Sequence, residues 1–301
     1  MRVTQGMLSN NMLRNVSNSY SNLGKYMDQL STGKKINKPS DDPVVAMKGM
    51  NYRSQVSDIE QFQRNIGEVH NWMDNSDSAL DKSTQALQRL RELATQAANG
   101  TYEEGQRENI AEEVDQLKEH LVEIANTKVN NKYIFNGTAT TGTDGEPPVS
   151  IDDDGTIDQL STNTNTVKIE VADGTNLPVN VNPEEVFGDE NSNVFKDVEA
   201  FSQALKDDDQ AGLEDALNNL DNRIDDVVSV RADLGARMNR VELIENRIKD
   251  QEVTATRMMS DNEDADMEEV IMNLTTQESV HRAALSAGSR IIQPTLMDFL
   301  R

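Results

Sequence analysis

The chain has 301 residues with a formal net charge of −24, 36% hydrophobic residues, 4% aromatic residues and no cysteine. The negative charge argues against nucleic acid as a partner, and the lack of cysteine excludes disulfides, thiolate nucleophiles and zinc bound by thiolates. Ordinary domains carry ~45–50% apolar residues counting glycine, so this composition favours narrow hydrophobic seams and disfavours a large enzyme core.

The basic amino-terminal segment, residues 1–40, is predicted to be a helix with one apolar seam. Its apolar residues alternate in steps of three and four, which keeps one helix face against a partner helix. A transit peptide or a helix lying on lipid has a similar composition, but lipid binding requires no unbroken 3/4 step. We therefore interpret the segment as packing on another helix through Leu13, Val16, Tyr20, Leu23, Met27 and Leu30.

A second helix is predicted after residues 39–43, Pro-Ser-Asp-Asp-Pro, which offer side-chain acceptors and then a first-turn proline. It would run from about 44 to 98, roughly 80 Å if continuous, and stop at Asn99-Gly100. Thr101 and Glu104 match a capping box that begins a third helix, whose apolar seam covers residues 110–124.

The strongly acidic stretch at 140–209 is predicted to be a separate module exposed to solvent, and strands from about 133 to 186 are predicted to form a small β insert there. Residues 168–171 and 179–181 alternate between apolar and polar, as half-buried strands do. Asp144-Gly145, Asp154-Gly155 and Asp173-Gly174 are dipeptides typical of tight turns.

Helical spacing returns from Leu213 to Ile248, with Arg231 and Glu245 as the polar exceptions in the seam. Ser260 and Glu263 match a second capping box, which predicts the start of a last helix. This helix is a possible partner for the amino-terminal seam through Met267, Ile271, Leu274, Leu285 and Ile292.

The predicted fold is mainly α, with long antiparallel helical-bundle rods formed from both chain ends and a small β-rich domain inserted in the middle. Three parts are expected. They are a terminal helical assembly domain (1–42 and 258–301), a helical rod domain (43–136 and 195–257) and an inserted acidic domain (137–194).

No catalytic, cofactor-binding or metal site is predicted. His70, His120 and His281 lie far apart in sequence and outside any HExxH motif. Residues 152–155, Asp-Asp-Asp-Gly, lack the ligand spacing of an EF-hand, and the acids at 261–266 are interpreted as helix-capping residues. Neither an apolar signal-peptide core nor ~18 consecutive apolar residues occur, so Sec export and membrane insertion are not expected.

Residues 30–43, Leu-Ser-Thr-Gly-Lys-Lys-Ile-Asn-Lys-Pro-Ser-Asp-Asp-Pro, resemble the amino-terminal signature of the bacterial flagellin superfamily. Residues 231–240, Arg-Ala-Asp-Leu-Gly-Ala-Arg-Met-Asn-Arg, are similar to its carboxy-terminal signature, and residues 263–266 to its acidic junction before the last helix. Residues 133–138, Tyr-Ile-Phe-Asn-Gly-Thr, and the ending at 292–300 resemble the hook-associated protein 3 family more than filament flagellin. Thr295 and Met297 depart mildly from the pattern of that ending.

This resemblance implies a structural, non-enzymatic protein at the junction of the flagellar hook and filament. The implied partners are copies of the chain itself, a hook-side hook-associated protein, flagellin and a cytoplasmic flagellar export chaperone. The implied location is the extracellular flagellum, reached by type III export without a cleaved signal peptide. Filament flagellin itself is the alternative within the superfamily, and a cytoplasmic coiled-coil scaffold is the alternative outside it.

The thin terminal seams suggest how such a protein would assemble. Burying a Leu or Ile contributes ~1.5–3 kcal/mol, whereas ordering the backbone costs ~1–2 kcal/mol per residue. We therefore expect residues 1–40 and about 260–301 to be poorly ordered in an isolated monomer and to pair fully only against neighbouring subunits.

Overall fold

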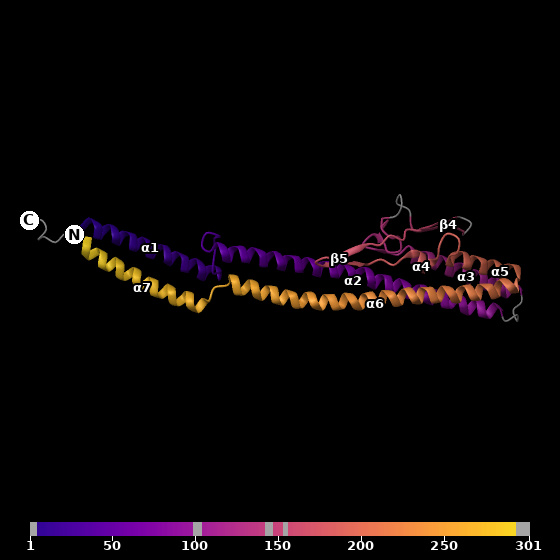
Figure 1. The fold of residues 1–301 in the computed structure, drawn as a ribbon. Coiled ribbons are helices and arrows are strands. Elements are labelled where there is room, and N and C mark those ends of the chain that lie inside the picture. The colour runs from indigo at the N-terminus through magenta and orange to yellow at the C-terminus, as the bar shows by residue number, and fades with distance from the viewer. Residues whose placement is uncertain (1–4, 99–103, 142–146, 153–155, 293–301) are drawn as a thin grey trace, which may run out of the picture. The chain divides into compact units, whose positions relative to one another are not determined.

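The computed structural model describes residues 5–98, 104–141, 147–152 and 156–292. It confirms the mainly α prediction. The chain divides into two compact units, which we call the terminal unit (residues 1–58 and 250–301) and the central unit (residues 59–249). The helices are α1 (Gln5–Thr32), α2 (Pro43–Ala98), α3 (Glu104–Ala125), α4 (Pro183–Phe187), α5 (Val194–Asp207), α6 (Gln210–Glu263) and α7 (Met267–Ile292) (Figure 1).

Helix α2 begins where the sequence predicted. The Asp42 Oδ1 atom accepts hydrogen bonds from the Val44 and Val45 amides at 3.0 and 3.1 Å, so Asp42 caps the helix and Pro43 occupies its first turn. The helix then continues without interruption to Ala98. The Asn99-Gly100 stop and Thr101 lie outside the described residues.

The strands form three separate two-stranded antiparallel sheets, all within the central unit. The Asp173-Gly174 turn is confirmed, with Gly174 at φ +66° between its two strands, whereas the other two predicted turns lie outside the described residues. The predicted strand at 179–181 is wrong: the strand ends at Pro178, and beyond it the Asn180 side chain accepts from the Val167 amide at 2.8 Å, where a ladder would use backbone groups. The strands are β1 (Lys128–Val129), β2 (Lys132–Tyr133), β3 (Val149–Ile151), β4 (Ile157–Leu160), β5 (Lys168–Ala172) and β6 (Thr175–Pro178).

The hydrophobic core lies in the central unit. Residues spaced along α2, α3 and α6, among them Leu80, Leu121 and Leu220, are at most 1% exposed. An aromatic group completes it: Phe187 meets Phe135 edge to face at 5.3 Å between ring centroids and stacks on Phe195 at 5.6 Å. Side chains before the predicted insert, inside it and after it therefore share one core.

The polar exceptions in the α6 seam are paired with α2. The Arg231 guanidinium contacts Asp77 at 2.7 Å and Asp81 at 2.6 Å, and these bonds raise its pKa. The Glu245 carboxylate accepts from Lys249 at 2.6 Å and lies 3.1 Å from His70 Nε2, and these contacts lower its pKa. At both interruptions of the apolar pattern, a polar contact therefore joins α6 to α2.

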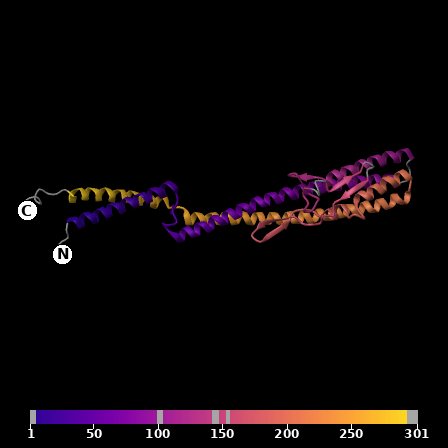
Figure 2. The same cartoon turned by 90° about the horizontal axis from the view of Figure 1, so that it is seen from above.

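The terminal unit has much less core. Among its described residues, the buried apolar side chains are Ala255, 7% exposed, and Val270, 6% exposed. Helices α1 and α7 lie side by side (Figure 1 and Figure 2). Because so little apolar surface is buried, the packing of this unit is consistent with the narrow seams inferred from composition.

Candidate assembly interface

Helices α1 and α7 pack as an antiparallel pair through a seam containing half-buried apolar residues. On α1 the residues facing α7 follow one another in steps of four and three, and they include Met12, Val16 and Leu23. At one end of the seam Met12 contacts Gly288, where a Cβ atom would lie 2.2 Å from the methionine Cε. Gly288 therefore allows the two helices to approach closely.

Polar side chains also occupy this seam. Ser19 is 6% exposed, and its hydroxyl accepts a hydrogen bond of 3.0 Å from the Gln277 side chain. The His281 ring lies 6.0 Å from the ring of Tyr20 between centroids. A buried polar pair is satisfied in only one register, so Ser19 and Gln277 define how α1 aligns with α7.

The structure divides the predicted interface residues into two groups. Val16, Leu23, Leu30 and Leu274 are half-buried. The others point outward: Leu13 is 59% exposed, Tyr20 68%, Met27 54%, Met267 40%, Ile271 48% and Leu285 51%. Ile292 ends α7, and its side chain lies outside the described positions. The outward group forms what we call the outer face of the α1–α7 pair.

Two overlapping seams explain this division. Positions 13, 16, 20, 23, 27 and 30 form one 3/4 series, and positions 12, 16, 19, 23, 26 and 30 form a second that shares every other member. The intramolecular partner uses the second series. The apolar stripe of α1 is therefore wider than one partner helix covers, and Leu13, Tyr20 and Met27 remain exposed at seven-residue intervals.

The sequence prediction missed an apolar surface at the start of α2. Val44 is 58% exposed, Met47 58% and Met50 59%, and these three residues form what we call the α2 patch. Met50 also lines a cavity of about 220 Å³ together with Ile36 and Arg53. The i, i+3, i+6 spacing of the patch was a usable signal, because it places three large apolar side chains on one side of the helix.

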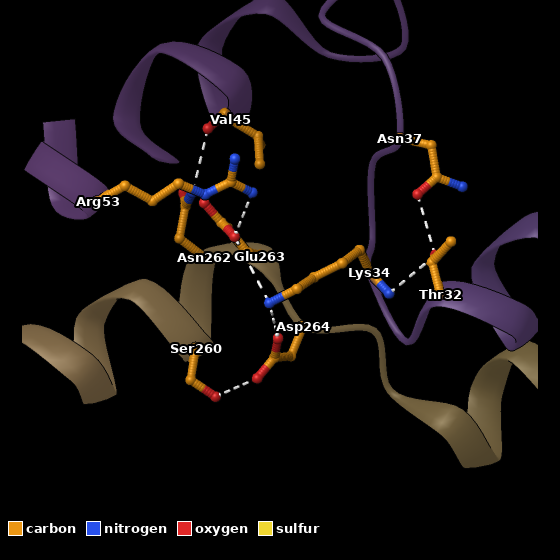
Figure 3. A network of polar contacts seen from close by, with 9 residues as sticks. All are labelled: Thr32, Lys34, Asn37, Val45, Arg53, Ser260, Asn262, Glu263 and Asp264. Atoms are coloured by element: carbon orange, nitrogen blue, oxygen red, sulfur yellow. Dashed lines mark hydrogen bonds and ion pairs between the residues drawn. The ribbon is translucent and has the colours of Figure 1, made fainter. Parts of the chain in front are cut away.

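The chain segment between α1 and α2 lies beside the segment between α6 and α7 (Figure 3), and backbone contacts join the two. Residue Lys34 pairs with Asp264 in a short antiparallel bridge. The Lys35 amide donates to the Glu263 carbonyl at 2.7 Å, and the Ala265 amide donates to the Gly33 carbonyl at 2.9 Å. The 33–42 segment and the 264–266 segment are therefore held against each other, and we call this arrangement the latch.

Ion pairs reinforce the latch. The Glu263 side chain is only 5% exposed and accepts from Arg53 Nη2 at 2.7 Å, with Lys34 Nζ 3.5 Å away. Lys34 Nζ lies 2.7 Å from the Asp264 carboxylate, which also accepts a hydrogen bond from the Ser260 hydroxyl. Hydrogen bonding to Lys34 holds the pKa of Asp264 below its usual value, and the same bond raises the pKa of Lys34.

The predicted capping box at Ser260 and Glu263 is wrong. Both residues lie in the last turn of α6, and α7 begins at Met267. The capping residue is Asp266, whose Oδ1 accepts from the Glu268 and Glu269 amides at 3.0 and 3.2 Å. The capping interpretation of the acids at 261–266 therefore holds for Asp266, whereas Glu263 and Asp264 pair with cations.

Two glycines are required by the latch. Gly33 ends α1 at φ +68°, a left-handed conformation that residues with a side chain rarely adopt. Gly49 faces the buried carboxylate, and a Cβ atom there would lie 2.7 Å from Glu263 Oε1. The first residue allows the chain to turn, and the second allows Glu263 to reach Arg53.

Among the described residues, no three His, Asp or Glu side chains lie together as a metal site would require. Within the same residues, no helix is long and apolar enough to cross a membrane. The features that remain for function are the outer face, the α2 patch and the latch.

Comparison with known proteins identifies the family. Residues 3–140 match the bacterial flagellin N-terminal helical region, and residues 217–300 match the bacterial flagellin C-terminal helical region. The chain is 25% identical to flagellar hook-associated protein 3 of Escherichia coli (strain K12), covering 95% of this chain and 96% of that protein. It is 27% identical to flagellin of Bacillus subtilis (strain 168), covering 94% of each.

A solved structure supports the same family assignment. The Bacillus cereus FlgL crystal structure superposes with a TM-score of 0.58 at 25% identity, covering 70% of this chain and 99% of that one. The two family matches include both helices of the α1–α7 pair and both sides of the latch. The chain therefore belongs to the bacterial flagellin superfamily, and within it flagellar hook-associated protein 3 is similar to this chain over nearly the whole length of both proteins.

Proposed function

We propose that this chain is the structural protein that joins the hook side of the bacterial flagellum to the flagellin filament, and that the outer face of the α1–α7 pair makes the joint. The observation that carries the proposal is the exposure of apolar side chains on both helices of a pair that already has its own seam. Leu13 on α1 and Leu285 on α7 are 59% and 51% exposed, and the two helices already pack on each other.

Apolar side chains that recur at seven-residue intervals on an exposed helix face are surface that a further helix can cover. Contacts that repeat head to tail without closing generate helical tubes, and one face can then meet both copies of this chain and related subunits. We therefore infer that copies of this chain repeat the contact as one level of such a tube, with a hook-side hook-associated protein on one side and flagellin on the other.

Export belongs to the same proposal. We infer that the chain leaves the cell through the flagellar type III apparatus with its amino terminus uncleaved, and that a cytoplasmic export chaperone covers α7 until then. The exposed Met267 and Ile271 on α7 are the surface such a chaperone would cover. Mass spectrometry of the extracellular protein should find the amino-terminal peptide intact, and a shortened terminus would contradict the export route.

The decisive experiment is Leu13→Asp. Leu13 points outward, so the charge leaves the α1–α7 seam intact but cannot be buried against a neighbouring subunit without a large desolvation cost. We expect normal secretion, a folded monomer and few filaments attached to hooks by electron microscopy. Asn18→Asp adds the same charge at another exposed position of α1 and should retain filaments.

Leu23→Asp tests the seam between α1 and α7, on which the outer face depends. Leu23 is half-buried in the seam, so the charge should open the α1–α7 pair while the central unit stays folded, and incorporation at the hook end should also fail. Normal filament retention in both aspartate variants would exclude the proposed interface. Recovery of the chain as the bulk protein of sheared filaments would favour filament flagellin instead.

A further inference from the structure

Methionine is concentrated in the terminal unit. Of the 13 methionines in the chain, only Met73 and Met238 lie between residues 59 and 249. Met73 is 0% exposed, and Met238 packs against the same central core. These two residues fill interior space as methionine commonly does.

The terminal unit places its methionines differently. On α2, Met47 and Met50 are 58% and 59% exposed, and on α7, Met267 and Met272 are 40% and 64% exposed. Met27 on α1 is 54% exposed and continues the line of Leu13 and Tyr20. Exposed thioethers therefore occur on both helices of the outer face, which carries the proposed contacts, and in the exposed apolar α2 patch.

We propose that these exposed methionines are sites at which peroxides oxidise the chain, and that the resulting sulfoxides block packing of the terminal unit on neighbouring subunits; the second part rests on the proposed function. In the reaction the thioether sulfur attacks one peroxide oxygen. The O–O bond breaks, an S–O bond forms, and the second oxygen of hydrogen peroxide leaves as water. The sulfur loses two electrons, and the peroxide gains them.

The structural consequence follows from polarity. A thioether is apolar and flexible, so it fits against neighbours of different shape, whereas a sulfoxide oxygen needs a hydrogen-bond donor wherever it is buried. Met47 lies between Val44 and Met50 in an apolar patch, and Met267 belongs to the outer face. At both places a neighbour that packs on apolar side chains would bury the new oxygen without a partner.

The first test is a footprint that needs no variant. Purified full-length monomer is treated with hydrogen peroxide, and sulfoxide is mapped by peptide mass spectrometry. Met47, Met50 and Met272 should be oxidised early and Met73 last, because Met73 is fully buried. The same exposed residues should be protected in isolated flagella. Oxidation of Met73 as fast as Met47 in the folded monomer, or no protection in flagella, would overturn the proposal.

The second test measures the effect on assembly. Purified protein is added to hooks isolated from a strain that lacks this chain, and hooks that carry it are counted by immunogold electron microscopy. Peroxide treatment should weaken binding of the natural protein about tenfold. The variant Met27→Leu/Met47→Leu/Met50→Leu/Met267→Leu/Met272→Leu keeps the apolar surface but cannot be oxidised at these positions, and it should bind equally well before and after treatment.

The control variant Met73→Leu/Met238→Leu should remain as sensitive as the natural protein, because its terminal methionines are unchanged. Unimpaired binding of natural protein with mapped sulfoxides at Met47 and Met267 would overturn the proposal, as would equal sensitivity of the fivefold leucine variant. Failure of untreated natural protein to bind hooks would count against the proposed junction function instead, and the footprint on the monomer would stand independently.

Discussion

At the scale of single residues, Glu263 organises the latch. Its side chain is 5% exposed and lies within 2.7 Å of Arg53 and 3.5 Å of Lys34, so one buried carboxylate joins three segments of the chain. Burial of a carboxylate is tolerated only with such partners. The Asn262 side chain adds a hydrogen bond of 3.0 Å to the Val45 carbonyl from the neighbouring position.

Replacement of Glu263 should therefore loosen the latch specifically. For Glu263→Gln we expect a loss of about 1–3 kcal/mol in local stability, because hydrogen bonds to charged groups are exchanged for weaker ones. Hydrogen exchange at the Lys35 and Ala265 amides, which form the backbone bridge, is the measurement. Asp261→Asn removes a charge from an exposed position nearby and should leave those amides protected. Equal exchange in both variants would contradict this role.

Gly49→Ala gives an independent test of the same site. In an exposed helix, alanine is more favourable than glycine by up to about 1 kcal/mol. At position 49 the added methyl group meets Glu263 Oε1 at 2.7 Å, so the buried carboxylate that Arg53 binds through Oε2 must shift, and we expect net destabilisation. Gly67→Ala, where nothing lies within 4 Å, is the matched control and should be neutral or stabilising. Urea unfolding of the two variants gives opposite signs if the contact matters.

The Lys34–Asp264 pair predicts a pH window. The pKa of Asp264 is lower in the folded chain than when unfolded, so its contribution is present above about pH 4 and is lost as the pH falls through the folded value. The pKa of Lys34 is raised, so its contribution is lost only as the pH rises above about 10. Thermal unfolding should show Asp264→Asn as slightly destabilised at pH 7 and indistinguishable from the natural protein near pH 2. Both groups are partly exposed, which limits the effect to about 0.2–1 kcal/mol.

At the scale of elements, the sequence predicted helices well and long-range pairing poorly. The start of α2 could be predicted from the sequence because Asp42 and Pro43 act within the first turn of the helix. Ser260 and Glu263 matched a local pattern equally well, but their partners Asp264, Arg53 and Lys34 include two residues more than 200 positions away in sequence. A capping box records only local spacing, so no sequence window could reveal that contact.

The α1 seam shows a second limit of prediction from sequence. Two 3/4 series share Val16, Leu23 and Leu30, and the choice between them depends on what α7 presents, including Gln277 opposite Ser19. The predicted residues on α1 were therefore one apolar series, without a way to separate inward from outward positions. The strand ending at Pro178 was misplaced for a related reason, since alternation at 179–181 resembles a strand whatever the backbone does.

At the scale of the whole molecule, the two units differ in how much apolar surface they bury. Large side chains such as Leu80, Leu121 and Phe195 are at most 1% exposed in the central unit. The described part of the terminal unit buries only Ala255 and Val270 among its apolar residues, although α1 and α7 are paired in it. Local stability follows buried contacts, so the units should open at different free energies.

We therefore predict that α1 and α7 exchange their amide hydrogens much faster than residues 66–97 in the isolated monomer, and that trypsin cleaves the terminal unit first. Assembly into flagella should slow exchange in α1 and α7, because neighbours then cover Leu13, Tyr20 and Ile271, whereas exchange in the central unit should change little. The buried side of α2 at Leu80 and Leu87 is an internal reference that is the same in both states. Terminal helices that are as protected as this reference in the free monomer would mean that they need no neighbours, and the mechanism of assembly through the outer face would have to be abandoned.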